Sequence, residues 1–125
     1  MIENSLRSIL TGYKPLSAKV GARIYPVDFP QKCTKPAIIY HKVGDPNEGS
    51  HKDLLIQYAV HAPKYAEVEG IISLVWKAFE TFDSGVKEGY MIHTIEQTGQ
   101  IMQSVDSEAS LYERSEIFRV LYSEV

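Results

Sequence analysis

The chain has 125 residues, of which 44% are hydrophobic and 23% are charged, and its 13 Lys and Arg against 16 Asp and Glu give a formal net charge of −3. This length suits one domain, and this composition excludes intrinsic disorder, which requires low hydrophobicity together with high net charge. The basic residues are scattered rather than clustered, which argues against nucleic acid as the main partner. We therefore expect one folded domain over residues 1–125 without sequence-specific nucleic-acid binding.

Cysteine content and hydropathy indicate which covalent links, export signals and membrane segments to expect. Cys33 is the only cysteine, which excludes an internal disulfide and a cysteine-based zinc site within one chain. No apolar segment of the signal-peptide type follows Met1, because charged residues such as Glu3 and Arg7 interrupt it. The longest apolar stretch, 71–79, is far too short to span a bilayer. We expect a soluble protein that is not exported and has no membrane partner.

Two short helices are expected at the beginning of the chain. Residues 2–11 place apolar side chains at helical spacing, and Gly12 follows, where a left-handed residue ends a helix at low cost. A second helical turn is predicted over 15–20, which begins with proline and is followed by Gly21. Residues 23–25 then read as a short extended segment.

A hairpin with a long loop is predicted next. Residues 37–43 are rich in the β-branched and aromatic types that favour strands. Residues 52–61 alternate along their length and predict a second strand, joined to the first by a turn-rich loop. We expect the two strands to be antiparallel, with Val43 paired to Lys52.

The clearest element is a helix predicted over 63–82. It carries one apolar stripe, made of Val68, Ile71, Ile72, Val75, Trp76, Phe79 and Phe82. Burial of these side chains contributes at most about 14 kcal/mol, whereas ordering the residues of such a helix costs about 1–2 kcal/mol apiece. The helix therefore cannot stand alone and must pack on the sheet.

Two further strands complete the predicted fold. Residues 90–97 alternate, with Ile92 and Thr94 on the same face, and 111–124 form a long final strand. The segment 98–109 is polar and ambiguous, and part of it either extends a strand or pairs with one. We predict an α+β fold: a mostly antiparallel sheet of about four strands, a long helix packed across one face, and a short N-terminal helix.

No constellation of catalytic or metal-binding residues is evident. The four histidines lack the spacing of a zinc site, and His41 is expected to face Leu54 across the hairpin rather than His61. Cys33 lies between lysines, which makes it reactive without making it catalytic. The glycines are single and spread out, so no phosphate-binding loop is formed. We expect no cofactor, no metal and no enzymatic activity.

Aromatic residues and two polar segments point to contacts with other proteins. Five tyrosines lie on predicted strands, where either sheet packing or an interface explains them. The loop 44–51 is long for a hairpin and is either mobile decoration or a contact arm. The candidate interface residues lie in this loop and in the segment 98–109: Asp45, Asn47, Glu48, His51, Gln100, Gln103 and Asp106.

Several segments spread over nearly the whole chain carry a resemblance by their order and spacing. They are Ile2 to Leu10, Val20-Gly21, Arg23-Ile24-Tyr25-Pro26, Lys35-Pro36-Ala37-Ile38-Ile39-Tyr40, Tyr58-Ala59-Val60-His61-Ala62, Lys64-Tyr65-Ala66-Glu67-Val68, Leu111-Tyr112-Glu113-Arg114-Ser115 and Phe118-Arg119-Val120. Together they resemble the tail-completion, or tail-terminator, proteins of long-tailed bacteriophages and prophages.

The resemblance implies a structural virion protein with a small α+β subunit. It implies a homo-oligomer, a six-fold ring at the head-proximal end of the tail tube, which ends tube polymerisation and offers a surface to the head-side connector. Its partners are then the tail tube protein and the connector protein, and its location is the virion tail after assembly in the host bacterial cytoplasm. Two other hypotheses remain open: another neck or head-completion protein of the same virion, and a small unassembled enzyme or regulator.

Overall fold

The computed structural model describes residues 1–30, 33–44, 47–48, 51–106 and 111–125. Its helices are α1 (Ile2–Gly12), α2 (Lys14–Val20) and α3 (Tyr65–Phe82). Its strands are β1 (Ile24–Pro26), β2 (Ala37–Gly44), β3 (Asn47–Glu48), β4 (His51–Ala62), β5 (Gly85–Lys87), β6 (Tyr90–Asp106) and β7 (Leu111–Glu124).

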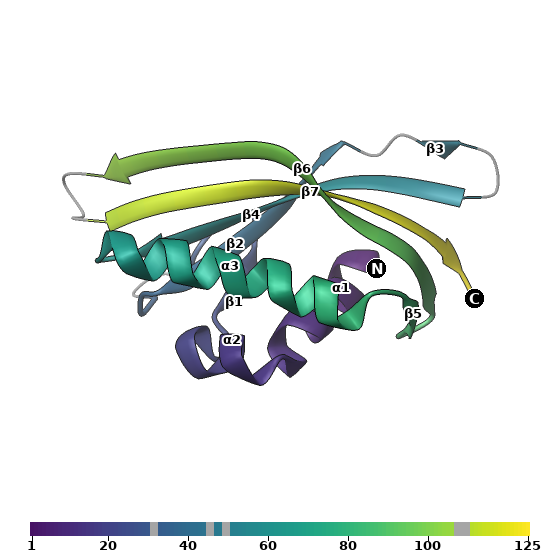
Figure 1. Cartoon of the computed structure of the whole chain (residues 1–125), viewed down its shortest axis with the longest axis horizontal. Coiled ribbons are helices and arrows are strands. Elements are labelled where there is room, and N and C mark those ends of the chain that lie inside the picture. Colours follow the sequence, from purple (N-terminus) through teal and green to yellow (C-terminus); the bar gives the residue numbers. More distant parts are fainter. Residues whose placement is uncertain (31–32, 45–46, 49–50, 107–110) are drawn as a thin grey trace.

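One curled sheet forms a layer over the helices. Its strands follow the order β1-β2-β4-β7-β6-β5, and β3 pairs with β4. Among the described strands, β1 and β2 pair in parallel and the other neighbours are antiparallel. All three helices lie on the same side of the sheet (Figure 1). The α+β class predicted from the sequence is therefore confirmed.

The number of strands differs from the prediction of about four, because β1, β3 and β5 add to the four longer strands. These three elements contain two or three residues each. A segment of that length carries no alternating pattern that a sequence reveals. It becomes a strand because a longer neighbour offers it backbone hydrogen bonds.

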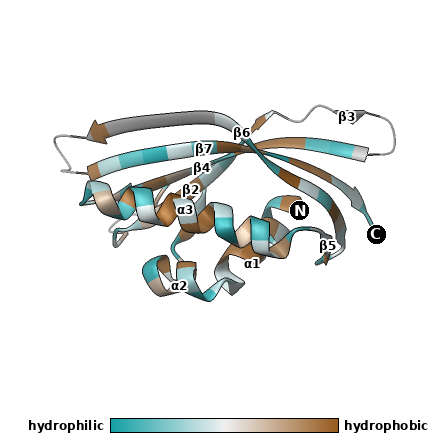
Figure 2. Cartoon of the chain, in the orientation of Figure 1, coloured by the Kyte–Doolittle hydropathy of each residue, from teal (hydrophilic) through white to brown (hydrophobic). Residues whose placement is uncertain are grey.

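Helix α3 packs on β4 and β7 through the predicted apolar stripe. Val68, Ile71, Ile72, Val75 and Phe79 are buried, together with Ala78, whereas Trp76 and Phe82 are partly buried. Figure 2 shows hydrophobic residues of α3 interspersed with hydrophilic ones along the helix. The helix begins at Tyr65, two residues after Pro63, where the prediction had placed its start.

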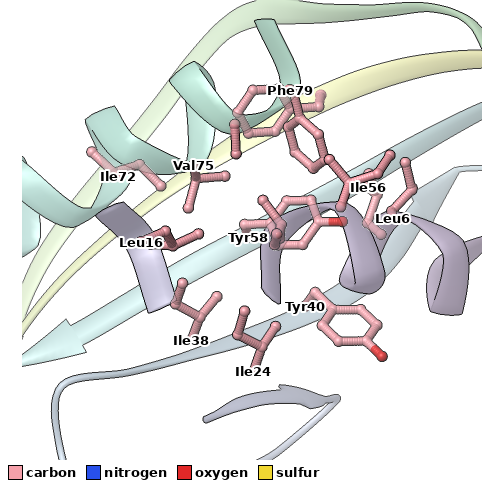
Figure 3. Close-up of a cluster of buried hydrophobic side chains, with 14 of the residues drawn as sticks. Leu6, Leu16, Ile24, Ile38, Tyr40, Ile56, Tyr58, Ile72, Val75 and Phe79 are labelled. Carbon is pink, nitrogen blue, oxygen red and sulfur yellow. The ribbon is translucent and has the colours of Figure 1, made fainter. Parts of the chain in front are cut away.

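An aromatic cluster stands at the centre of the core. The ring centroid of Tyr58 lies 5.6 Å from that of Phe79 and 5.9 Å from that of Phe118, and the latter two are 5.3 Å apart. These rings come from β4, α3 and β7, so the cluster joins the helix to both central strands. Figure 3 shows Leu6 and Leu16, from the two N-terminal helices, in the same cluster around Tyr58.

The N-terminal helices are tied to the edge of the sheet by Arg7. Its guanidinium donates hydrogen bonds from Nε to the carbonyl of Ile24, at 2.9 Å, and from Nη2 to that of Ala22, at 2.8 Å. The side chain thus links α1 to the beginning of β1. The predicted end of the second helix is found, because α2 ends at Val20, before Gly21 with φ of 58°. The first helix differs from the prediction: Gly12 belongs to α1 and does not have the left-handed conformation expected there, and Tyr13 follows in an extended conformation.

The predicted register of the β2–β4 hairpin is wrong by three residues. Lys52 pairs with Asn47 of β3, not with Val43, and His41 faces Gln57, not Leu54. The difference arises because β3 takes the place on β4 that the prediction assigned to the end of β2. A bulge between Lys42 and Gly44 then changes the register by one further residue.

Strand β6 is longer than predicted and does not alternate regularly. It continues to Asp106, and its register shifts between Ile92 and Thr94 and again between Gln97 and Ile101. After the first shift, Ile95 packs against the core in which Ile92, three residues earlier, is buried, so that the predicted alternation fails there. A bulge adds a residue to one strand, and the faces of all later residues are exchanged.

The buried hydroxyl of Tyr58 provides a test of the core. It finds no hydrogen-bond partner among the described protein atoms. Removing an unsatisfied buried hydroxyl relieves its desolvation penalty, so Tyr58→Phe should raise the free energy of unfolding by about 1 kcal/mol. Tyr58→Ala, which removes the ring as well, should lower it by about 3–5 kcal/mol. Urea unfolding of both variants measures the two effects, and a loss of stability in Tyr58→Phe contradicts this account.

The same pair of variants has a pH dependence of known sign. Burial, with smaller contributions from Tyr40 and Glu3, raises the pKa of Tyr58 well above its ordinary value of 10.0. The unfolded chain therefore releases this proton before the folded protein does, and stability falls as the pH rises above about 10. Tyr58→Phe should reduce this alkaline loss, which unfolding curves at pH 9 and above would measure.

Candidate assembly interface

The seven predicted interface positions fall on two separate parts of the molecule. Asn47 and Glu48 form β3, and His51 begins β4; with the end of β2 they make up what we call the β3 arm. Gln100, Gln103 and Asp106 lie in β6, in the hairpin that β6 forms with β7. Asp45 lies outside the described residues. The β3 arm and the end of β6 lie at opposite ends of the sheet (Figure 1), so these positions form two groups and not one site.

The β3 arm is anchored where β4 meets the end of β7. Lys52 pairs with Asn47 on one side and with Tyr122 on the other. Its Nζ lies 3.1 Å from Oε1 of Glu124, and this hydrogen bond to a carboxylate raises the pKa of the Lys52 ammonium. Both groups are exposed, so the contact orients the arm more than it stabilises the fold.

A polar network anchors the β6–β7 hairpin to α3. Nε2 of Gln97, in β6, donates to Oε2 of Glu116 at 2.5 Å. Arg114 lies between two carboxylates: it forms an ion pair with Glu69 of α3 and lies 3.4 Å from Glu116. Glu116 is buried and Arg114 is largely buried. These contacts therefore hold β6 and β7 against α3.

Each edge of the sheet is covered over part of its length only. Strand β1 pairs with β2 at residues 38–40, and β5 pairs with β6 at residues 90–92. In the part of the chain that the structure describes, no strand pairs with the outer edge of β2 at 41–44 or with that of β6 at 93–106. Backbone groups along these two segments remain available to another strand.

The sheet face opposite the helices carries an ion pair that the sequence did not reveal. Leu54 and Phe118 point into the core, so the neighbouring Asp53 and Arg119 point to the other face. Nε of Arg119 lies 3.0 and 2.8 Å from the two carboxylate oxygens of Asp53, and Nη2 lies 2.5 Å from one of them. These residues are 66 positions apart in the sequence and meet because their strands are neighbours. No local sequence pattern therefore predicts this ion pair.

His61 and His93 lie on β4 and β6 and have separate partners. Nε2 of His61 lies 2.7 Å from the carboxylate of Glu113, and Nε2 of His93 lies 3.0 Å from Oγ of Ser123. Within the described residues, no group of three or more His, Cys, Asp or Glu side chains is placed to hold a metal ion.

Two hollows occur on the helical side. One, of about 450 Å³, lies between α2 and α3 and is lined by Gly70, Ile71 and Leu74, with Lys19, Glu67 and Lys77 among its polar residues. The other, of about 240 Å³, lies between the end of α3 and β6 and includes Trp76, Glu80 and Asp83. None of the described helices has the length and apolar character needed to cross a membrane.

The Asp53–Arg119 pair can be tested by a double-mutant cycle. Because the Asp53 side chain is only 8% exposed, Arg119→Ala leaves a nearly buried carboxylate without its bidentate partner and should cost about 1–2 kcal/mol of unfolding free energy. The double variant Asp53→Ala/Arg119→Ala should recover part of that cost, with a coupling energy of about 1 kcal/mol. Strictly additive single and double variants in urea unfolding would show that the two side chains do not interact.

Comparisons with known proteins relate this arrangement to one solved assembly. A chain in a structure described as the virion of a native gene transfer agent particle has the same fold, with a TM-score of 0.71. The alignment covers 95% of this chain and 92% of that chain at 13% sequence identity. No protein-family model matches this sequence, and no curated protein matches it. At this level of identity the likeness establishes the fold that the two chains share.

Proposed function

We propose that this protein is a structural, non-enzymatic component of a phage-like virion. The observation that carries the proposal is the fold shared with a virion chain over nearly the full length of both proteins. The alignment covers 95% of this chain and 92% of that chain. A subunit with free edges and two projecting parts is suited to assembly.

Within the virion, we propose the role of a tail terminator. The protein then forms a six-membered ring on the head-proximal end of the tail tube, ends tube polymerisation there and presents a surface to the head-side connector. The ordered set of sequence segments that resembles this family supports the role. The resemblance also implies location in the virion tail, after assembly in the cytoplasm of the host bacterium.

The geometry of the subunit fits a protein that has two partners. A cap contacts the tube on one side and the connector on the other, so it needs two contact regions that face apart. The β3 arm and the β6–β7 hairpin lie at opposite ends of the sheet (Figure 1). We therefore propose that each contacts one of the two partners, through Asn47, Glu48 and His51 in the arm, with Asp45 beside them in sequence, and Gln100, Gln103 and Asp106 in the hairpin.

Binding to tube ends tests the role directly. Purified tail tubes are incubated with the protein and examined by electron microscopy after gold labelling, and tube elongation is followed in parallel. Label at one end of each tube, with elongation stopped, is the expected result. Light scattering during gel filtration should give the mass of six chains for the ring released from tubes. Unlabelled tubes that continue to grow contradict the terminator role, and binding to the connector without the tube favours another neck protein.

Two matched triple variants test the assignment of the contact regions. Asn47→Ala/Glu48→Ala/His51→Ala alters the arm, and Gln100→Ala/Gln103→Ala/Asp106→Ala alters the hairpin. Each should change the free energy of unfolding by less than about 1 kcal/mol and weaken binding to one partner about tenfold or more, which corresponds to about 1.4 kcal/mol. Each variant serves as the control for the other. Unchanged affinity of both variants for tube and connector would remove these residues from the interface.

A further inference from the structure

We infer that neighbouring copies of this chain join by antiparallel pairing of the free edge of β6, residues 93–106, with the free edge of β2, residues 41–44, of the next copy. This inference rests on the proposed ring and names the surface that builds it. It starts from the observation that each edge is covered over part of its length only, by β1 at 38–40 and by β5 at 90–92.

The β6 edge lacks the side chains that normally protect an exposed edge. Proteins prevent edge-to-edge pairing with prolines, lysines or very short edge strands. Residues 93–106 contain no Pro, Lys or Arg, and they form most of the longest strand described. By contrast, β1 on the other side has three residues and ends at Pro26. The long edge therefore has the character of a pairing surface.

A bulge divides this edge without closing it. Gly99 has φ of 83°, and the register with β7 shifts between Gln97 and Ile101. Oγ1 of Thr98 donates to the carbonyl of Ile117 at 2.9 Å, which holds the bulge against β7. The backbone on either side of the bulge continues in strand conformation and remains open to a partner.

The unpaired backbone N–H and C=O groups of the β6 edge fit an extended strand as the partner. The β2 edge of a second copy of this chain is such a strand. Strands β2 and β7 run in one direction and β4 and β6 in the other. A second copy whose β2 lies beside β6 therefore continues the alternation, and the new pair is antiparallel. In sequence, the β6 edge carries Glu96 and Asp106, whereas the β2 edge carries His41 and Lys42, and the Lys42 ammonium lies 3.5 Å from the Glu3 carboxylate of α1. Pairing of two β6 strands would bring acidic side chains together, which favours pairing with the β2 edge.

The positions of β1 and β5 favour a closed assembly over a flat one. Because β1 occupies residues 38–40 of β2, only the following part of that strand is available to a neighbour. Without displacement, β1 of the neighbour would lie level with residues 101–103 of β6 and separate the two edges, so the neighbour must be displaced along the strands. Closed β-structures require such a stagger between strands. The two contacting surfaces also differ from each other, and a ring with more than two subunits needs this head-to-tail type of interface.

Cysteine cross-linking tests the inference. In a Cys33→Ser background, His41→Cys is combined with Glu96→Cys or, in a second variant, with Val105→Cys. A short bifunctional thiol reagent is added under conditions in which light scattering shows assembly. Covalent multimers that extend beyond dimers are expected for at least one double variant, whereas each single variant should remain monomeric on a denaturing gel. The control is His41→Cys/Lys77→Cys, in which the second cysteine lies on the exposed surface of α3 and should not cross-link.

The outcomes separate this inference from the proposed function. Rings seen by electron microscopy without cross-links from either double variant overturn the edge pairing and leave the terminator role standing. Cross-linked chains that neither close nor bind tube ends support the pairing and contradict the terminator role. A covalent dimer from Glu96→Cys or Val105→Cys alone indicates pairing of two β6 strands and overturns the inference, as does a protein that stays monomeric and yields no cross-links at millimolar concentration.

Discussion

The packing of α3 against β4 and β7 is the interaction on which the rest of the structure depends. Tyr58, Phe79 and Phe118 bring one large ring from each of these elements into a single cluster, and Trp76 stacks on Phe118 with 6.2 Å between ring centroids. Aromatic contacts of this kind add to the free energy gained by burial. Because the cluster uses only one face of the sheet, it leaves the other face and the outer strand edges outside the core.

Elements with a strong local pattern were predictable from the sequence. The apolar stripe from Val68 to Phe79 identified the long helix and its buried face, since a helix that packs on a sheet needs residues at this spacing. Strand β7 was predicted with the bounds that the structure has, Leu111–Glu124, and its pairing with β4 continues from Tyr112 to Tyr122 without a shift in register. The two polar segments chosen as candidate interface also mark two projecting parts of the fold, β3 and the end of β6.

Features that arise from pairing between distant segments were not predictable. The bulges at Lys42 and beside Ile92 change register through contacts with β4 and β7, which no local pattern encodes. The partnership of Asp53 with Arg119 depends in the same way on the final strand order. The uncovered edges depend on where β1 and β5 end. An extended segment was predicted at 23–25, where β1 lies, but its pairing with β2 was not, and β5 was not predicted.

Hydrogen–deuterium exchange of the free and assembled protein tests most directly whether the sheet edges, and not the helical side, join the copies. Every second amide of an edge strand already bonds to its inner neighbour, while the others point outward. On assembly, alternate amides within residues 93–106 and amides of residues 41–44 should become protected, and those on the exposed surface of α3 should exchange as before. Protection that appears around Gly70 and Leu74, in the groove between α2 and α3, with unchanged exchange along β6, would contradict the account.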